Sequence, residues 1–144
     1  MSDRTGRQRG TVNPDVVRRI IEQGDYDELV RRAEEWGRSL GRQGLKMTQI
    51  RRLFGEVRRL QMRWDPVRLR MLRPRLHYTA ARIREGGDEL RQILDPAIQA
   101  VLDGRGRAEE RFKVMVDLFE AILAYFTYHE RGGRGERDVH SPEA

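Results

Sequence analysis

The sequence lacks the features on which several kinds of stabilisation and targeting depend. It contains no cysteine, which excludes disulfides and thiolate metal sites. No apolar run approaches the roughly 18 residues that a membrane-spanning helix needs. The N-terminal stretch MSDRTGRQRGTVN carries basic residues but no apolar segment of the kind found in secretory signals. We therefore expect a cytoplasmic protein without a membrane segment.

Signatures of catalysis are missing as well. Histidine occurs only at His77, His129 and His140, and none of the three stands in a zinc-type spacing such as HExxH. The sequence has no P-loop and no GxSxG motif, and its glycine groups GRGR and RGGRG do not follow a strand as phosphate-binding loops do. We expect a protein that is not an enzyme and that holds neither a metal nor a cofactor. A small ribonuclease using His77 or His129 is the minor alternative.

Lysine is nearly absent, because 27 of the 29 basic residues are arginine. The guanidinium group is a planar fork that binds phosphate through two hydrogen bonds and also stacks on bases. A GC-rich genome or a hot habitat would produce the same preference for arginine over lysine. Composition alone therefore leaves both explanations open.

The positions of the charges favour binding to a polyanion. Residues 42–84 hold thirteen basic and two acidic side chains, whereas residues 1–41 hold eight of each. Residues 85–144 hold eight basic and thirteen acidic side chains. The whole excess of the net charge of +6 thus lies in one 43-residue stretch. Because this stretch also has apolar periodicity, we expect it to fold and to present its charge on a surface.

Apolar periodicity and helix-capping residues predict an all-α protein, a small helical bundle of about five to six helices. We expect one helical domain over residues 13–130, between a disordered N-terminal tail at 1–12 and a flexible C-terminal tail at 131–144. No strand-like alternation persists anywhere in the sequence. The predicted helices cover residues 14–23, 25–39, 48–63, 66–85, 88–102 and 108–129, with a turn at 41–44.

The predicted helix that begins near Thr48 has one apolar and one basic face. Its apolar residues recur at helical spacing from Ile50 to Leu60. At about 100° per residue, its arginines fall on the opposite side of the helix from this stripe. Gly55 lies in the middle of the basic face, where it either permits close approach of a nucleic-acid backbone or has no role. Binding by these arginines is a stronger prediction than a merely solvated face, since only Glu56 opposes them.

The next predicted helix begins at Asp65-Pro66, a typical cap followed by proline at the first helical position. Pro74 predicts a kink or a restart of this helix. Arg75, Tyr78 and Arg82 lie along its flank, where Tyr78 is suited to stacking on a base or ribose. A half-buried position in the core is the more common role of such a tyrosine. We expect contacts that do not read base sequence, because no helix-turn-helix, zinc-finger or RNP-type motif is present.

The last predicted helix has the widest apolar stripe, which covers about half of its circumference. Such a helix either lies at the centre of the bundle or shares its apolar surface with a partner. The second possibility keeps open an adaptor that binds proteins and has no particular affinity for RNA.

Three segments together resemble the small subunit of the type III-A CRISPR effector, the Csm small-subunit family. The segments are GRQGLKMTQIRRLF at 41–54, MLRPRLHYTAAR at 71–82 and FKVMVDLFEAILAYFTYHERGG at 112–133. The matching motifs are Thr48-Gln49-Ile50-Arg51, Leu72-Arg73-Pro74-Arg75-Leu76-His77-Tyr78 and Phe119-Glu120-Ala121-Ile122-Leu123-Ala124-Tyr125. They follow the order and spacing of the family over roughly two-thirds of the chain. The Thr or Ser expected before Thr48 is replaced by Met47.

The resemblance implies a helical, non-catalytic subunit of a ribonucleoprotein complex in antiviral defence. Its copies would stack in a minor filament beside the backbone subunits, contact the large polymerase-like subunit, and hold the guide RNA and target RNA through backbone contacts. The residues it implies on the RNA side are Lys46, Gln49, Arg51, Arg52, Arg58 and Arg59, followed by Arg75, Tyr78 and Arg82. Glu120 and Ala124 are the candidates for a subunit interface, although an exposed helix face is the more common reading of such a pair.

Overall fold

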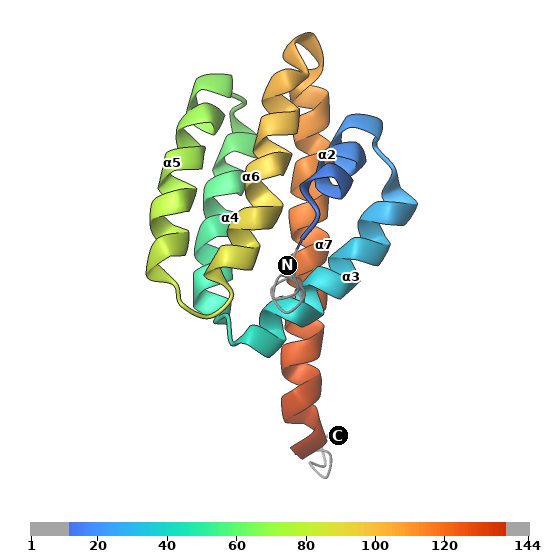
Figure 1. Ribbon diagram of the computed structural model, residues 1–144, viewed down its shortest axis with the longest axis vertical. Coiled ribbons are helices and arrows are strands. Elements are labelled where there is room, and N and C mark those ends of the chain that lie inside the picture. The colour runs from blue at the N-terminus through green and yellow to red at the C-terminus, as the bar shows by residue number, and fades with distance from the viewer. Residues whose placement is uncertain (1–11, 138–144) are drawn as a thin grey trace, which may run out of the picture.

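The computed structural model is an all-α fold, shown in Figure 1, so the predicted fold class is confirmed. It describes residues 12–137, with side chains as far as Arg131. Six α-helices and one short 3-10 helix follow one another in this range, which contains no strand. The elements are α2 (Pro14–Gln23), α3 (Tyr26–Gln43), α4 (Met47–Met62), α5 (Pro66–Arg82), α6 (Gly87–Asp103), η1 (Arg105–Arg107) and α7 (Ala108–Arg137).

Side-chain caps set the starts of two helices as predicted. The Oδ1 atom of Asn13 accepts a hydrogen bond from the backbone N–H of Asp15 at 2.9 Å. The Oδ1 atom of Asp65 accepts from the backbone N–H of Val67 at 3.0 Å. A proline occupies the first helical position in both cases, where its missing N–H costs nothing.

Two predicted boundaries around residue 44 are wrong. Helix α3 continues through the predicted turn and ends at Gly44, whose φ of 95° suits glycine. Helix α4 begins one residue before Thr48, and its N-cap is Lys46. The side chain of Gln49 closes the first turn, since its Oε1 atom accepts from the backbone N–H of Lys46 at 3.0 Å. No serine or threonine is therefore needed at the cap.

The prolines inside the sequence do not interrupt their helices. Pro74 lies within a continuous α5, where a kink or restart was predicted, and Pro96 lies within a continuous α6. Pro74 is exposed and Pro96 is partly exposed. Water can therefore reach the carbonyl groups that lose their helical hydrogen bonds.

At both ends, the described structure continues beyond the predicted helices. Val12 is buried, and its N–H donates to Gln92 Oε1 at 3.3 Å, so the bundle includes this residue. At the other end α7 continues past the predicted stop at 129 and reaches Arg137. Residues 1–11 and 138–144 lie outside the described residues.

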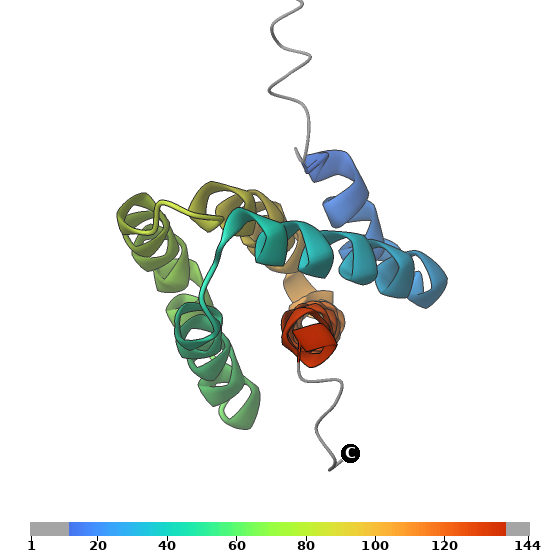
Figure 2. The same ribbon diagram turned by 90° about the horizontal axis from the view of Figure 1, so that it is seen from below.

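Helix α7 is the central element of the bundle. It packs against α2, α3, α4 and α6, and its C-terminal part extends beyond the other helices (Figure 1). Seen from below, α3, α4 and α6 surround it, while α5 stands at the outer edge (Figure 2). The wide apolar stripe is thus covered within the chain, with Phe112, Met115, Val116, Leu118, Phe119, Ile122 and Phe126 buried. This accounts for the stripe without a partner protein.

The crossing of α3 and α7 depends on Gly37. A Cβ atom at this position would lie 2.9 Å from the backbone oxygen of Ile122 and from the backbone nitrogen of Phe126. No side chain fits at that distance, so glycine allows the two backbones to come into contact. This explains why a residue unfavourable to helices stands inside α3.

Candidate nucleic-acid interface

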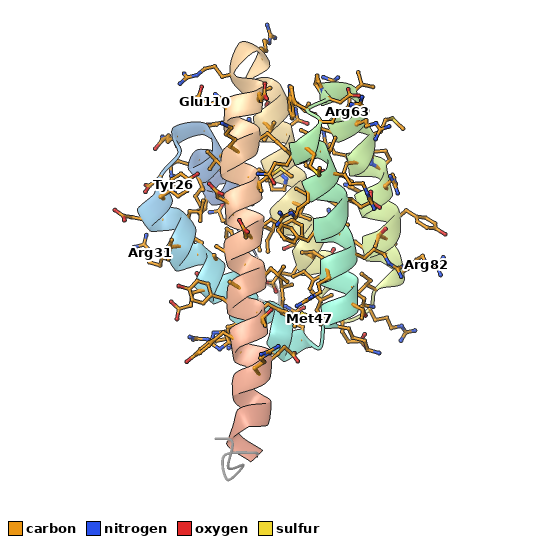
Figure 3. The ribbon with its side chains drawn as sticks, turned by 180° about the vertical axis from the view of Figure 1, so that it is seen from behind. Tyr26, Arg31, Met47, Arg63, Arg82 and Glu110 are labelled. Carbon is orange, nitrogen blue, oxygen red and sulfur yellow. The ribbon has the colours of Figure 1, made fainter. Side chains whose placement is uncertain are left out.

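Helix α4 separates its apolar and basic residues onto opposite faces, as the sequence predicts. The apolar residues Ile50, Leu53, Phe54, Val57 and Leu60 are buried in the core. The basic residues Arg51, Arg52, Arg58, Arg59 and Arg63 are exposed. Figure 3 labels Arg63, which follows the last residue of α4, and Arg82 on the neighbouring α5.

A groove runs between α4 and α5, and we call it the α4–α5 groove. One part is a hollow of about 500 Å³ lined by Thr48, Gln49, Arg52, Leu53, Glu56, Tyr78, Thr79, Arg82 and Ile83. The other part is a hollow of about 290 Å³ lined by Glu56, Arg59, Leu60, Arg68, Met71, Leu72 and Arg75. Glu56 borders both hollows, so they are neighbours along one groove. The groove brings together six residues that the sequence implicated from separate helices, namely Gln49, Arg52, Arg59, Arg75, Tyr78 and Arg82.

The charge of this groove is strongly positive. Two arginines come from α4 and three from α5, each set at a spacing of seven residues, which is about 10.5 Å along a helix. The five are Arg52, Arg59, Arg68, Arg75 and Arg82. Guanidinium groups at repeated positions on two facing walls form a trough of the kind that binds a phosphate backbone.

Glu56 is the one carboxylate among the residues that line these two hollows. Its Oε2 atom lies 2.8 Å from Arg75 Nη2, and its side chain is 21% exposed. Arg75 is therefore engaged within the chain, whereas no ion pair is formed by Arg52 or Arg59 among the described residues. Arg52 and Arg59 are thus the cations in the groove that are most available to a ligand.

Tyr78 is exposed, and the interpretation of this residue as half-buried core is wrong. Its side chain is 65% exposed beside the groove. Arg82 Nη1 donates to Tyr78 Oη at 2.8 Å, and the Arg82 guanidinium carbon lies 5.5 Å from the centre of the ring. This pair offers an aromatic face next to a cation, an arrangement suited to a stacked base and its phosphate.

Two of the predicted arginines lie on the other side of α4. Arg58 points towards α7, where its Nη1 atom is 3.9 Å from Glu120 Oε2, and its guanidinium carbon lies 5.5 Å from the ring centre of Phe54. Arg51 is seven residues earlier in the same helix and shares this side. The pair at 51 and 58 is about 100° around the helix from the pair at 52 and 59, so one groove cannot hold all four.

The remaining predicted site residues lie at the start of α4 and on α7. Lys46 is exposed at the start of α4, and Gln49 lines the groove while its oxygen caps the helix. Glu120 and Ala124 are exposed on α7, and Glu120 faces Arg58 of the same chain. The contact of Glu120 within the chain shows that a neighbouring subunit is not needed to supply its partner.

Polar contacts to α6 add to the buried apolar residues that position helix α5. Arg73 Nε lies 2.8 Å from Asp95 Oδ1, its Nη1 atom donates to Gln99, and His77 Nε2 lies 3.3 Å from Asp95 Oδ1. Partial burial raises the pKa of Asp95, but the hydrogen bonds from Arg73 and His77 outweigh it and leave this pKa below its usual value of 3.8. His77 thus has a structural contact to α6. No cluster of three or more metal-ligating side chains occurs among the described residues.

Sequence reasoning missed Arg68 and the central place of Glu56. Arg68 stands seven residues before Arg75 and fourteen before Arg82, so the heptad spacing of the three contained a usable signal. Glu56 was seen only as an opposing charge on its own helix. Its role in the groove depends on the way α5 lies beside α4, which no pattern within one helix predicts.

Comparison with known proteins decides the family. The family model Csm2 Type III-A matches residues 23–131, which include α3 to α6 and most of α7. The chain belongs to the Csm2 family. It is therefore a small subunit of the Csm complex of type III-A CRISPR systems, as the resemblance implied. No curated protein and no solved structure gives a significant match.

The family places the chain in a complex with other Csm subunits. Csm2 is a structural small-subunit family. Over the residues that the structure describes, no helix has the length and hydrophobicity required to span a bilayer.

Proposed function

We propose that this Csm2-family chain holds the guide RNA and target RNA of a cytoplasmic type III-A complex through contacts that do not read sequence. The α4–α5 groove binds the phosphate backbone, and Tyr78 with Arg82 stacks on a base or ribose at one end of the groove. Copies of the chain stack beside the backbone subunits and the large subunit, and the cleavage chemistry belongs to those partners.

The arginines of the groove are the observation that carries this proposal. Five guanidinium groups face one trough that contains a single carboxylate, and three of them, Arg52, Arg59 and Arg82, have no acidic partner among the described residues. Phosphate neutralisation with release of counterions is the main source of affinity in such a site. Gln49 is the one amide side chain that lines the two hollows, and its oxygen is already engaged in capping α4, so it is poorly placed to read base edges.

The other two readings of the sequence have less support. The adaptor hypothesis depended on an apolar stripe of α7 shared with a partner, and the chain itself covers that stripe. The ribonuclease hypothesis depended on His77 or His129. His77 contacts Asp95, and His129 lies on α7 with its Nε2 atom buried and without a hydrogen-bond partner.

Binding of unstructured single-stranded RNA by the full chain tests the proposal. The variant R52Q/R59Q removes the two arginines that α4 contributes to the groove. At about 0.1 M salt we expect a roughly tenfold loss of affinity, and a plot of log K against log salt that is flatter by up to about 1.4. Fluorescence anisotropy at four or more salt concentrations gives both quantities.

The matched control is R31Q/R107Q, which removes the same charge from arginines that are 69% and 71% exposed on other parts of the surface. We expect this control to lose less than threefold in affinity. Equal losses in the two variants would show that RNA responds only to net charge, and the groove would then have no special role.

A further inference from the structure

Helix α5 has a second apolar stripe, on the side that faces away from the core. Val67, Met71 and Tyr78 are 62%, 58% and 65% exposed, and Pro74 and Ala81 are exposed between and beyond them. At about 100° per residue these five positions fall within roughly 80° of one another. We call them the outer stripe. It lies almost opposite the buried set of the same helix, which is Leu69, Leu72, Leu76, Ala80 and Ile83.

A surface helix normally has a polar face opposite its buried one. Here the outer stripe runs over fifteen residues, an axial length of about 21 Å, at the outer edge of the bundle, where no other described helix covers it (Figure 2). A continuous exposed apolar surface of this kind marks an interaction site. Its length equals about four helical turns, which suits one helix of a partner.

Arginines border the outer stripe on both sides. Arg68, Arg75 and Arg82 follow its groove side, and Arg70 stands with His77 on the side towards α6. Arg70 forms no ion pair among the described residues, and Arg68 reaches Asp65 only at 3.9 Å. The stripe therefore lacks carboxylates of its own to match these cations, and a partner that covers it has to supply them.

We propose that the outer stripe binds an amphipathic helix of another protein, whose apolar side chains are flanked by aspartate and glutamate. The apolar residues would cover Val67 and Met71, and the carboxylates would pair with Arg68 and Arg70. This contact goes beyond the RNA binding proposed above and does not depend on it. The two surfaces adjoin, since Met71 and Tyr78 of the outer stripe also line the α4–α5 groove.

Other occupants fit this surface less well. RNA offers no aliphatic surface to cover Val67 and Met71. Helices that bind a membrane surface bury bulky Trp, Phe or Leu side chains in it, and the outer stripe has none of these. A second copy related by a twofold axis would place the arginines beside the stripe against each other, which is repulsive.

Site-specific photocrosslinking in the complex purified from its native host tests the inference. The full chain carries a benzophenone amino acid in place of Met71, and a control chain carries it in place of Met62, which is 87% exposed at the end of α4. The crosslinked peptides are sequenced by mass spectrometry. We expect position 71, and not position 62, to crosslink to a segment of another protein with apolar residues at helical spacing and carboxylates between them.

The variants M71E and M62E add the same charge to the same basic region, so they form a matched pair. We expect M71E to reduce the recovery of the crosslinked protein at least tenfold, and M62E to change it less than twofold. Both should keep the helical circular dichroism of the parent, because both methionines are exposed. Crosslinking at 71 to RNA, to lipid, to a second copy or to a segment without carboxylates overturns the inference, as do equal recoveries for the two variants. RNA recovered with each variant is measured separately. Because Met71 also lines the groove, R52Q/R59Q is the variant whose RNA recovery reports on the proposed function alone.

Discussion

Glu56 lies 2.8 Å from Arg75 across the α4–α5 groove, where five arginines and this one carboxylate face the same trough. The ion pair partly neutralises the groove at its centre. Since both partners are accessible to water, the pair contributes only about 0–1 kcal/mol to folding. Its main effect is therefore on binding of anions.

Replacing this carboxylate should strengthen RNA binding. In E56Q the groove loses its negative charge and Arg75 is released, so we expect roughly three- to tenfold tighter binding and a steeper dependence on salt. Thermal unfolding should change little. The control E34Q removes an acid that is 48% exposed on α3 and should give a smaller gain. An unchanged affinity in E56Q would mean that RNA does not enter the centre of the groove.

The aromatic ring of Tyr78 should contribute through stacking. We expect Y78A to weaken RNA binding by about 1–3 kcal/mol and Y78F to retain the parental affinity, because stacking needs the ring and not the hydroxyl group. Tyr128 provides the control, as it is 68% exposed on α7 away from the groove, and Y128A should leave the affinity unchanged. If Y78F binds as weakly as Y78A, the hydroxyl contact with Arg82 is the important one.

Two glycines inside helices should respond in opposite ways to the same substitution. G37A places a Cβ atom 2.9 Å from backbone atoms of α7, and we expect it to lower the free energy of unfolding by about 1–3 kcal/mol. G55A meets nothing within 4 Å, and we expect it to raise that free energy by about 0.5–1 kcal/mol. Urea denaturation followed by circular dichroism measures both. RNA affinity of G55A then shows whether the open centre of α4 serves close approach of a nucleic-acid backbone.

The buried carboxyl group of Glu89 should make stability depend on pH. Burial raises the pKa of Glu89 above its usual value of 4.5, and hydrogen bonds from Ser39 and Gln43 only partly oppose this rise. The folded protein therefore keeps this proton at pH values where the unfolded chain has lost it. We expect the free energy of unfolding to fall as the pH rises from about 4.5 through the pKa of the folded state.

Two variants separate Glu89 from other groups that titrate. E89Q should abolish this slope in urea denaturation curves recorded between pH 4 and pH 8. S39A removes one hydrogen bond to the carboxylate and should extend the slope to higher pH. Asp95 acts with the opposite sign, since its lowered pKa gives stability that is lost as the pH falls below its usual value of 3.8. A slope that persists in E89Q would assign the effect to a different group.

Local rules predicted the helices well where one residue type decides the outcome. Asn13-Pro14 and Asp65-Pro66 begin helices as expected, and the period of the apolar residues from Ile50 to Leu60 identifies the buried face of α4. Local rules failed at Gly41 and Pro74, which lie inside helices. Tertiary packing makes the cost of a glycine inside a helix tolerable at Gly41, and solvent access makes the cost of a proline tolerable at Pro74.

The candidate site was predictable as a list of residues and not as a surface. The sequence implicates Arg52 and Arg82, but only the packing of α5 beside α4 makes them line the same hollow. The same packing leaves Arg51 and Arg58 on another side of the bundle, although all four share one charge pattern in the sequence. Distances between helices are set by contacts far apart in the chain, which a single sequence does not reveal.

The attachment of α5 to α6 has a genetic consequence. Arg73 and His77 hold α5 to Asp95 of α6. The separation between the groove arginines of α4 and those of α5 therefore depends on α6, which carries none of the arginines in the groove. A change in α6 would then widen or narrow the trough without altering its charge. Second-site suppressors of defects in the groove should consequently arise in α6 around Asp95 and Gln99, at positions that no RNA touches.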